Sequence, residues 1–137
     1  MTVTLFSAMG IAGSGVTVYR KWLDAVSDNI SNMNDARPTS QKAFQARYVV
    51  AQAVNYGAGD GGVQVAGIKY GDAQGRLVYE PDNPVADKNG YVRYPDIDLG
   101  DQMGQLIMAQ RGYEANLAVI DRAKSAYEAA LQLGQGA

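Results

Sequence analysis

An unbroken heptad repeat of apolar residues at the start of the chain is the feature that most constrains its fold. Apolar side chains follow one another there at alternating steps of four and three, the spacing that keeps one face of a helix apolar. The members of this repeat are Leu5, Met9, Ala12, Val16, Tyr19, Leu23, Val26, Ile30 and Met33. The pattern predicts a helix over 5–33, roughly 43 Å long at 1.5 Å per residue. A helix of that length needs a partner along its apolar face.

Glycine weakens the first half of this helix. Gly10, Gly13 and Gly15 fall inside the repeat, and each glycine in a helix interior costs about 1 kcal/mol relative to alanine. A helix that is marginal by itself gains its stability from packing. We therefore expect residues 5–15 to become ordered only when a partner covers them.

A second apolar repeat occupies the last third of the chain, ahead of a C-terminal stop at Gly134. Its members are Met103, Leu106, Gln110, Tyr113, Leu117, Ile120, Lys124, Tyr127 and Leu131. Gln110 and Lys124 are polar residues at core positions, where such residues often set the register of a coiled coil. Alternatively, the buried stripe is rotated onto Ala109 and Ala123. The sequence leaves both alternatives open.

The middle of the chain has a different character. Pro38 ends the first helix, and strand-like runs follow at 44–54, 63–70, 77–79 and 90–94. Glycine-rich or Asn/Asp-rich turns separate these runs. The sequence thus predicts an α+β fold with three regions. They are an N-terminal axial helix over 1–36, a β-rich insert over 37–98 and a C-terminal axial helix over 99–137.

The two terminal helices are predicted to form one axial core. The insert returns the chain to the same end of the first helix, which predicts an antiparallel, coiled-coil-like hairpin. We expect three residues of the first helix to pack against two of the second. These are Leu23, Val26 and Ile30 against Leu117 and Ile120. A pair of helices has no closed core, so part of each stripe is predicted to pack on other copies of the chain.

Composition excludes several classes of function. The chain of 137 residues has no cysteine and no histidine, which removes thiol nucleophiles, the Ser-His-Asp relay and the usual zinc ligands. A net charge of −2 without a basic cluster gives no footprint for nucleic acid. We therefore expect no enzyme activity, no cofactor or metal, no nucleic acid and no small-molecule substrate. The N-terminus lacks the pattern of a cleaved secretory signal, and no apolar run is long enough to span a membrane.

Three motifs have a catalytic or binding interpretation and a structural one. Residues 10–15 resemble a phosphate-binding glycine loop, but no strand precedes them and no Lys-Ser/Thr pair follows. The run from Asp87 to Gly90 suggests half a calcium loop or a plain Asn-Gly turn, and the turn is the simpler interpretation. Asp96 and Asp98 form an Asp-x-Asp pair, which suits acid-base chemistry or the N-terminus of a helix. The helix end is favoured.

Three stretches together resemble the flagellar basal-body rod proteins, over nearly the whole chain. The first runs from Ile11 to Ser14 and on through 23–32, where an apolar helix ends in an Asn-rich signature. The second is 78–87 followed by Gly90-Tyr91-Val92-Arg93-Tyr94-Pro95, and the third is Arg111-Gly112-Tyr113-Glu114-Ala115-Asn116 with Lys124 and 131–134 beyond it.

The resemblance implies a structural subunit of the bacterial flagellar basal-body rod. Such a protein is exported unfolded through the flagellar type III export apparatus without a cleaved signal peptide. It then assembles with other rod proteins and with further copies of itself, with its helices in an inner tube and its insert facing outward. The polar groups that we expect to fix register are Asn29, Asn32, Arg111 and Asn116.

The alternative is a small secreted binding module whose β insert, in a chain with nine tyrosines, recognises a ligand. Tyrosine supplies a large rigid surface with a polar tip, which also suits a surface that is wet before assembly and buried after it. Self-association separates the two interpretations, because a binding module stays monomeric at high concentration.

Overall fold

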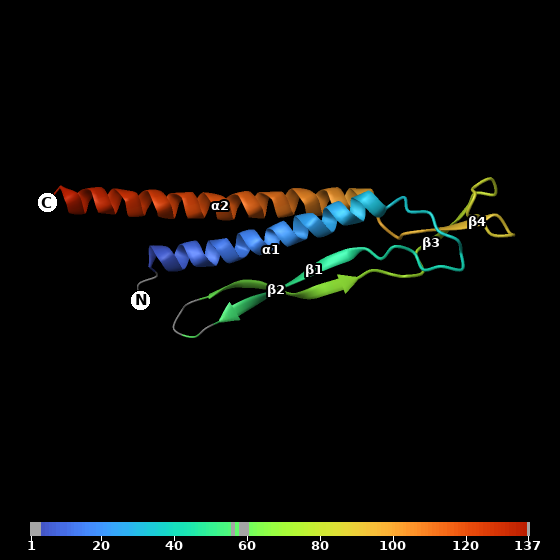
Figure 1. Ribbon diagram of the computed structural model, residues 1–137, viewed down its shortest axis with the longest axis horizontal. Helices are drawn as coiled ribbons and strands as arrows, with labels where there is room; N and C mark the ends of the chain where they lie inside the picture. Colours follow the sequence, from blue (N-terminus) through green and yellow to red (C-terminus); the bar gives the residue numbers. More distant parts are fainter. Residues whose placement is uncertain (1–3, 56, 58–60, 137) are drawn as a thin grey trace.

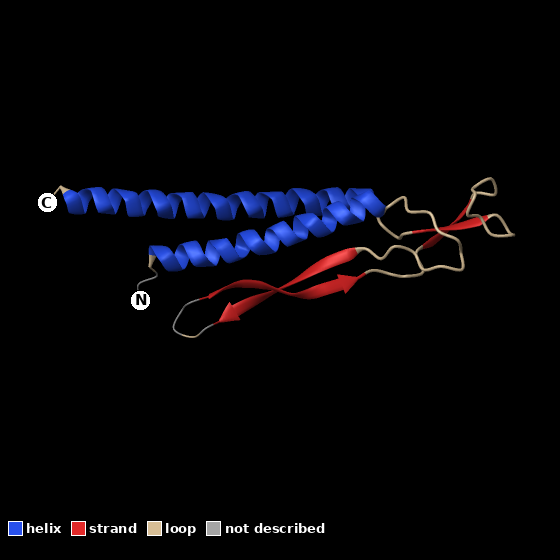
Figure 2. Cartoon of the chain, in the orientation of Figure 1, coloured by secondary structure: helices blue, strands red, loops and turns tan. Residues whose placement is uncertain are grey.

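The computed structural model describes residues 4–55, 57 and 61–136 of the chain. Two long helices bracket two small antiparallel sheets, as the α+β prediction requires (Figure 2). The elements are α1 (Leu5–Asn32), β1 (Arg47–Asn55), β2 (Gly61–Tyr70), β3 (Arg76–Tyr79), β4 (Tyr91–Tyr94) and α2 (Leu99–Gln135). One sheet is the β1–β2 hairpin and the other pairs β3 with β4.

The elements form an elongated body of three layers (Figure 1). α1 and α2 lie side by side and run in opposite directions, and the β1–β2 hairpin lies along α1 without covering α2. The β3–β4 sheet lies beyond the end at which α1 finishes and α2 begins. Among the described helices and strands, α1 packs against both strands of the hairpin, whereas α2 packs against α1 alone.

Each helix begins at a side-chain cap. The Thr4 hydroxyl accepts a hydrogen bond from the backbone N–H of Ser7 at 3.1 Å. The Asp98 carboxylate accepts one from the backbone N–H of Asp101 at 2.8 Å, and Asp101 places a second negative charge in the first turn of α2. Both contacts satisfy backbone donors that a helix start leaves unpaired. Asp98 therefore acts as a helix cap, as the structural interpretation of the Asp-x-Asp pair predicted.

Close contacts between small and polar residues define the register of the helix pair. A Cβ atom on Gly15 would lie 2.5 Å from Asn116 Oδ1, and one on Gly112 would overlap the ring of Tyr19. Further along, the Trp22 indole N–H donates to Gln105 Oε1 at 3.2 Å. Residue numbers rise on one helix as they fall on the other, which is the register of an antiparallel pair.

This register corrects one expected contact. Leu117 and Ile120 follow Asn116, which lies opposite Gly15 near the start of α1. Val26 and Ile30 lie near its end, roughly 17–23 Å further along the axis at 1.5 Å per residue. The prediction that these residues of α1 pack on Leu117 and Ile120 within one chain is therefore wrong. Apolar density along the sequence located the stripes but not their alignment.

The buried stripe of α2 is the one centred on alanine. Ala109 is 0% exposed and Ala123 is 7% exposed, whereas Gln110 and Lys124 face solvent. The two polar side chains make local contacts instead. Gln110 donates to Glu114 at 3.1 Å, and Lys124 lies 3.9 Å from the carboxylate of Glu128. Of the two alternatives that the sequence left open, the rotated stripe is the one adopted.

Backbone pairing and one aspartate hold the region around β3–β4 together. Arg37 and Arg93 exchange backbone hydrogen bonds of 2.9 Å each way. Asp87 Oδ1 accepts from the backbone N–H groups of Asn89 at 2.8 Å and Tyr91 at 3.0 Å, and its other oxygen accepts from the Thr39 hydroxyl at 2.9 Å. The run from Asp87 to Gly90 is thus a turn, with φ of +83° at Gly90.

The Asp87 turn is expected to respond to acid. The hydrogen bond from the Tyr91 backbone N–H, helped by those from Thr39 and Asn89, lowers the pKa of Asp87. A lowered folded-state pKa stabilises the fold above the ordinary aspartate pKa, and that contribution is lost as pH falls through the lowered value. NMR titration should give an Asp87 midpoint below that of an ordinary aspartate. Thr39→Val should raise it part of the way back, and a midpoint at or above the ordinary value would contradict this account.

Candidate assembly surface

The residues of the predicted α1 seam lie at several depths. Ala12 and Val26 are buried, Leu5 is exposed, and the remaining members are half-buried. The half-buried members are Met9, Val16, Tyr19, Leu23, Ile30 and Met33. The residues opposite α2 include Gly15, Trp22 and Asn29, spaced seven apart. Part of the face of α1 that contacts α2 is therefore formed by the residues one position before Val16, Leu23 and Ile30.

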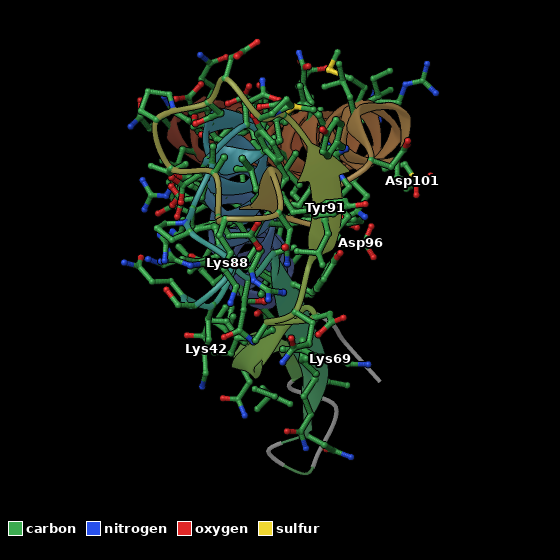
Figure 3. The ribbon with its side chains drawn as sticks, turned by 90° about the vertical axis from the view of Figure 1, so that its right-hand side faces the viewer. Lys42, Lys69, Lys88, Tyr91, Asp96 and Asp101 are labelled. Atoms are coloured by element: carbon green, nitrogen blue, oxygen red, sulfur yellow. The ribbon has the colours of Figure 1, made fainter. Side chains whose placement is uncertain are left out.

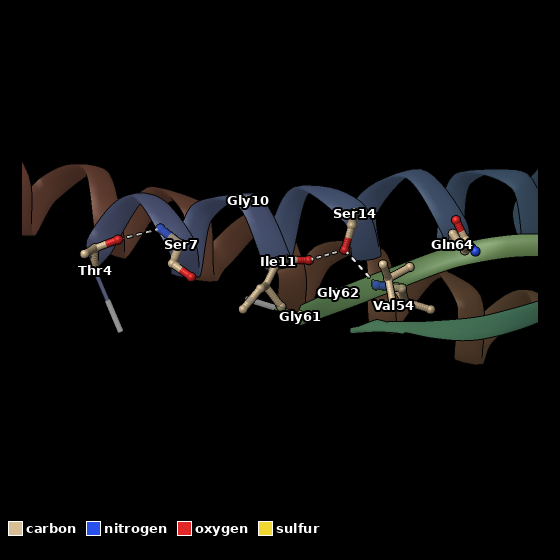
Figure 4. A pocket seen from close by; sticks show the side chains of 10 residues that line it. Thr4, Ser7, Gly10, Ile11, Ser14, Val54, Gly61, Gly62 and Gln64 are labelled. Carbon is tan, nitrogen blue, oxygen red and sulfur yellow. Dashed lines mark hydrogen bonds between the residues drawn. The ribbon is translucent and has the colours of Figure 1, made fainter. Parts of the chain in front are cut away.

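A second side of α1 faces the β1–β2 hairpin. Val18 and Ala25 are buried on α1. The Ser14 hydroxyl donates to the Ile11 carbonyl at 2.6 Å and accepts from the backbone N–H of Val63 on β2 at 3.1 Å (Figure 4). A Cβ atom on Gly62 would lie 2.8 Å from that hydroxyl oxygen, so the glycine lets β2 come this close. A groove of about 500 Å³ remains between the start of α1 and the hairpin.

One edge of the helix pair carries a half-covered apolar stripe. Met9, Val16, Leu23 and Ile30 are seven residues apart and therefore share a face of α1. On α2 the equivalent positions, one residue after the buried stripe, are Met103, Gln110, Leu117 and Lys124. In an antiparallel pair, positions that follow the contacting stripe by one residue lie along the same edge. This edge stripe lies on the side of α1 away from the hairpin.

Exposed apolar side chains lie on several faces of α2, the edge stripe included. The exposed members are Leu99, Met103, Ile107, Met108, Leu117, Val119, Tyr127, Leu131 and Leu133. The rings of Phe6 and Tyr127 lie 5.4 Å apart at the start of α1, and α2 continues past this contact to Gln135. Leu133, in that continuation, is 79% exposed. Of the predicted α2 seam, Leu106, Tyr113 and Ile120 are half-buried.

The four predicted register residues make different contacts. Asn29 is 0% exposed and hydrogen-bonds to both β1 and α2. Asn32 and Asn116 are half-buried and donate to carbonyls within their own helices, those of Asp28 and Gly112, at 2.8 Å each. Arg111 is exposed. Their part in assembly stays a prediction.

Gln102 is a buried polar residue that the heptad pattern of α2 did not predict. It is 2% exposed, and its Oε1 accepts from Asn29 Nδ2 at 3.0 Å. Gln102 lies seven residues before Ala109 and therefore on the same stripe as Ala109 and Ala123. Its seven-residue spacing from Ala109 would have predicted that Gln102 is buried, once the alanines were taken as the buried stripe.

The insert ends in an exposed aromatic pair. The rings of Tyr79 and Tyr91 lie 5.4 Å apart in an edge-to-face arrangement, and both side chains are exposed. Figure 3 looks along the body from this end, where Asp96 and Asp101 point outward. The structure between residues 4 and 136, apart from the undescribed loop positions, contains no cluster of acidic side chains that would hold a metal. No described helix is long and apolar enough to cross a membrane.

Sequence comparisons find rod proteins that match nearly the whole chain. A family described as "Flagellar basal body rod FlgEFG protein C-terminal" matches residues 88–133. The flagellar basal-body rod protein FlgC of Salmonella typhimurium strain LT2 is 36% identical over 134 residues, covering 97% of this chain and 100% of that protein. The chain belongs to the FlgC family of flagellar basal-body rod proteins.

Two further relatives place the chain in the same family. FlgC of Escherichia coli O157:H7 is 37% identical over 135 residues, covering 97% of this chain and 100% of that protein. FlgC of Borreliella burgdorferi strain B31 is 34% identical over 151 residues, with 96% and 99% covered. The matched C-terminal family region contains β4 and most of α2. In this FlgC family member, that region includes the helix with the exposed apolar faces.

Proposed function

We propose that this chain is a structural subunit of the flagellar basal-body rod, which assembles through its terminal helices and transmits torque without making or breaking a bond. One observation carries this proposal. α2 is a helix of 37 residues, and α1 is the one described helix or strand that packs against it. Its exposed apolar residues therefore need cover from another molecule.

The edge stripe is the surface that we assign to a neighbouring subunit. Met9, Val16, Leu23 and Ile30 offer a continuous apolar row, and Met103 and Leu117 extend it onto α2. A groove between two antiparallel helices accepts a third helix with heptad spacing. Further copies of this chain and the other rod proteins are the proposed partners. The whole helix pair then serves as the axial, coiled-coil-like core.

The insert, with proposed bounds of 37–98, is assigned to the outer surface of the rod. Its hairpin covers one side of α1 and its second sheet lies at one end of the helix pair, which leaves the edge stripe accessible. An insert facing outward would not obstruct packing of the helices into a tube. The aromatic pair Tyr79 and Tyr91 would then face surrounding components of the basal body.

Export through the flagellar type III apparatus, without a cleaved signal, is part of the same proposal. An exported chain must pass in an unfolded state, and glycine at positions 10, 13 and 15 keeps the start of α1 weak until it is packed. No cysteine is present to form disulfides on the way. We expect limited proteolysis of the purified monomer to cut first within residues 5–15. Full protection there would contradict ordering on assembly.

Ile30→Asp tests the edge stripe in cells. The substitution places a charge in the half-buried row, and we expect loss of rod assembly and of swimming. Ser31→Asp is the matched control because Ser31 is exposed on the adjacent position. Both purified variants should retain helicity by circular dichroism. Normal swimming of the Ile30→Asp strain would refute the assignment of this edge.

A small secreted binding module is the less favoured function. The relatives that cover nearly the whole chain are rod proteins, and the exposed apolar faces of α2 have no role in a monomeric module. Sedimentation at increasing concentration separates the two functions, because the rod subunit is expected to self-associate.

A further inference from the structure

A buried amide junction joins α1, β1 and α2 at one end of the helix pair. Asn29 is 0% exposed, and Gln102 is 2% exposed. Asn29 Nδ2 donates to Gln102 Oε1 and to the Arg47 carbonyl, at 3.0 Å each. Asn29 Oδ1 accepts from the Arg47 backbone N–H at 2.7 Å. One side chain thus holds both backbone groups of the first residue of β1 and a side chain in the first turn of α2.

A buried amide of this kind requires all of its partners at once. An unpaired polar group in a dry site loses its hydration without compensation, so hydrogen bonds in such a junction depend on one another. If α2 shifts along α1, Gln102 leaves Asn29 with an unpaired N–H. Any rotation of Asn29 toward a new partner breaks its two hydrogen bonds to Arg47.

We propose that the contact between Asn29 and Gln102 makes docking of the β1–β2 hairpin on α1 conditional on α2 occupying its native register. The backbones of the hairpin and of α2 do not approach each other closely within the described residues, and Asn29 hydrogen-bonds to both, so the coupling passes through Asn29. Asn29 and Gln102 are positioning residues in this proposal. It concerns a single chain and therefore does not depend on the proposed function in the rod.

The other polar contacts between α1 and the hairpin do not provide this coupling. Arg47 forms an ion pair with Asp28 at 2.6 Å, but both side chains are about half exposed, and such pairs contribute little. The backbone N–H of Val63 donates to the Ser14 hydroxyl near the other end of the hairpin. Both contacts join α1 to the hairpin alone. Neither contact includes a residue of α2, so neither depends directly on the position of α2.

α2 supplies a matched control three residues away. Gln105 Oε1 accepts from the Trp22 indole N–H at 3.2 Å, so Gln105 also receives one hydrogen bond from α1. That bond stays between the two helices. Gln102→Leu and Gln105→Leu therefore each remove one interhelical hydrogen bond from α2, but only the first one removes a partner of Asn29.

Hydrogen exchange of the full chain, resolved by NMR, tests the coupling. In Gln102→Leu we expect the Arg47 amide and the β1 amides to exchange about tenfold faster or more, as the loss of one buried hydrogen bond permits. In Gln105→Leu we expect the same amides to change by less than about twofold. Equal acceleration in both variants, or none in Gln102→Leu, would overturn the proposal.

A rescue variant separates coupling from general loss of structure. At a pH where its new carboxyl group is protonated, Gln102→Glu keeps a neutral acceptor oxygen for Asn29, and we expect Arg47 protection within about threefold of that in the unsubstituted chain at the same pH. If Gln102→Leu loses its helical circular dichroism signal, hydrogen exchange of the Gln102→Glu variant tests the proposal instead. Acceleration at Arg47 in protonated Gln102→Glu while the α2 amides stay protected would show that the retained contact does not maintain docking of the hairpin, and would also overturn the proposal.

Discussion

Replacing Ala109 by Asp is expected to destabilise the helix pair strongly. Ala109 has no exposed surface and lies on the stripe by which α2 packs against α1. An unpaired carboxylate there loses its hydration, which costs roughly 3–5 kcal/mol. That is a large share of the free energy of unfolding of an ordinary domain, about 5–15 kcal/mol. Chemical denaturation followed by circular dichroism measures the loss.

Gln110→Asp is the matched control for this experiment. Gln110 is the next residue on the same helix and is exposed, so the same new side chain stays hydrated. It loses one hydrogen bond to Glu114 and gains a like charge four residues away, which together cost under about 1 kcal/mol. Comparable destabilisation by the two variants would contradict the alanine-centred stripe.

Gly75→Ala is expected to disrupt the region around the β3–β4 sheet. Gly75 has φ of +58°, a conformation that favours glycine, and an added Cβ would overlap the carbonyl oxygen of Tyr94. The same Cβ would lie 2.7 Å from the Cβ of buried Ala43. Backbone strain and overlap together are expected to cost roughly 2–4 kcal/mol. The thermal unfolding midpoint measures this effect.

Gly57→Ala isolates the conformational part of that cost. Gly57 has φ of +79°, but no atom of the described residues lies within 4 Å of a Cβ added there. We expect a loss of about 1 kcal/mol, from backbone strain alone. A Gly75→Ala variant no less stable than Gly57→Ala would show that Tyr94 and Ala43 yield to the added methyl group.

Sequence periodicity predicted the elements with good accuracy. The helix expected over 5–33 spans Leu5–Asn32, and the four strand-like runs correspond to β1 to β4. The turn at Asp87 and the cap at Asp98 followed from local hydrogen-bonding chemistry, which depends on few neighbours. Such features are encoded within a few residues and can be read from one sequence.

The alignment of the helices could not be read in the same way. α1 is buried on two sides, by α2 and by the hairpin, so its apolar residues exceed those needed for one seam. On α2 the residues that pack against α1 include Ala109 and Ala123. A search for large apolar residues at heptad spacing favours Leu117 and Tyr127 over these small alanines. The buried amides of Asn29 and Gln102 are far apart in the sequence. Only the fold brings them together.

The two ends of the body are unlike, and this gives the subunit a direction. α2 continues past the start of α1 at one end, and the β3–β4 sheet lies at the other. A contact that joins one end of a copy to the opposite end of the next uses two different surfaces, so it either closes into a ring or continues as a helical filament. A row of subunits joined in this way is therefore polar: every subunit points in the same direction, and the two ends of the row are different.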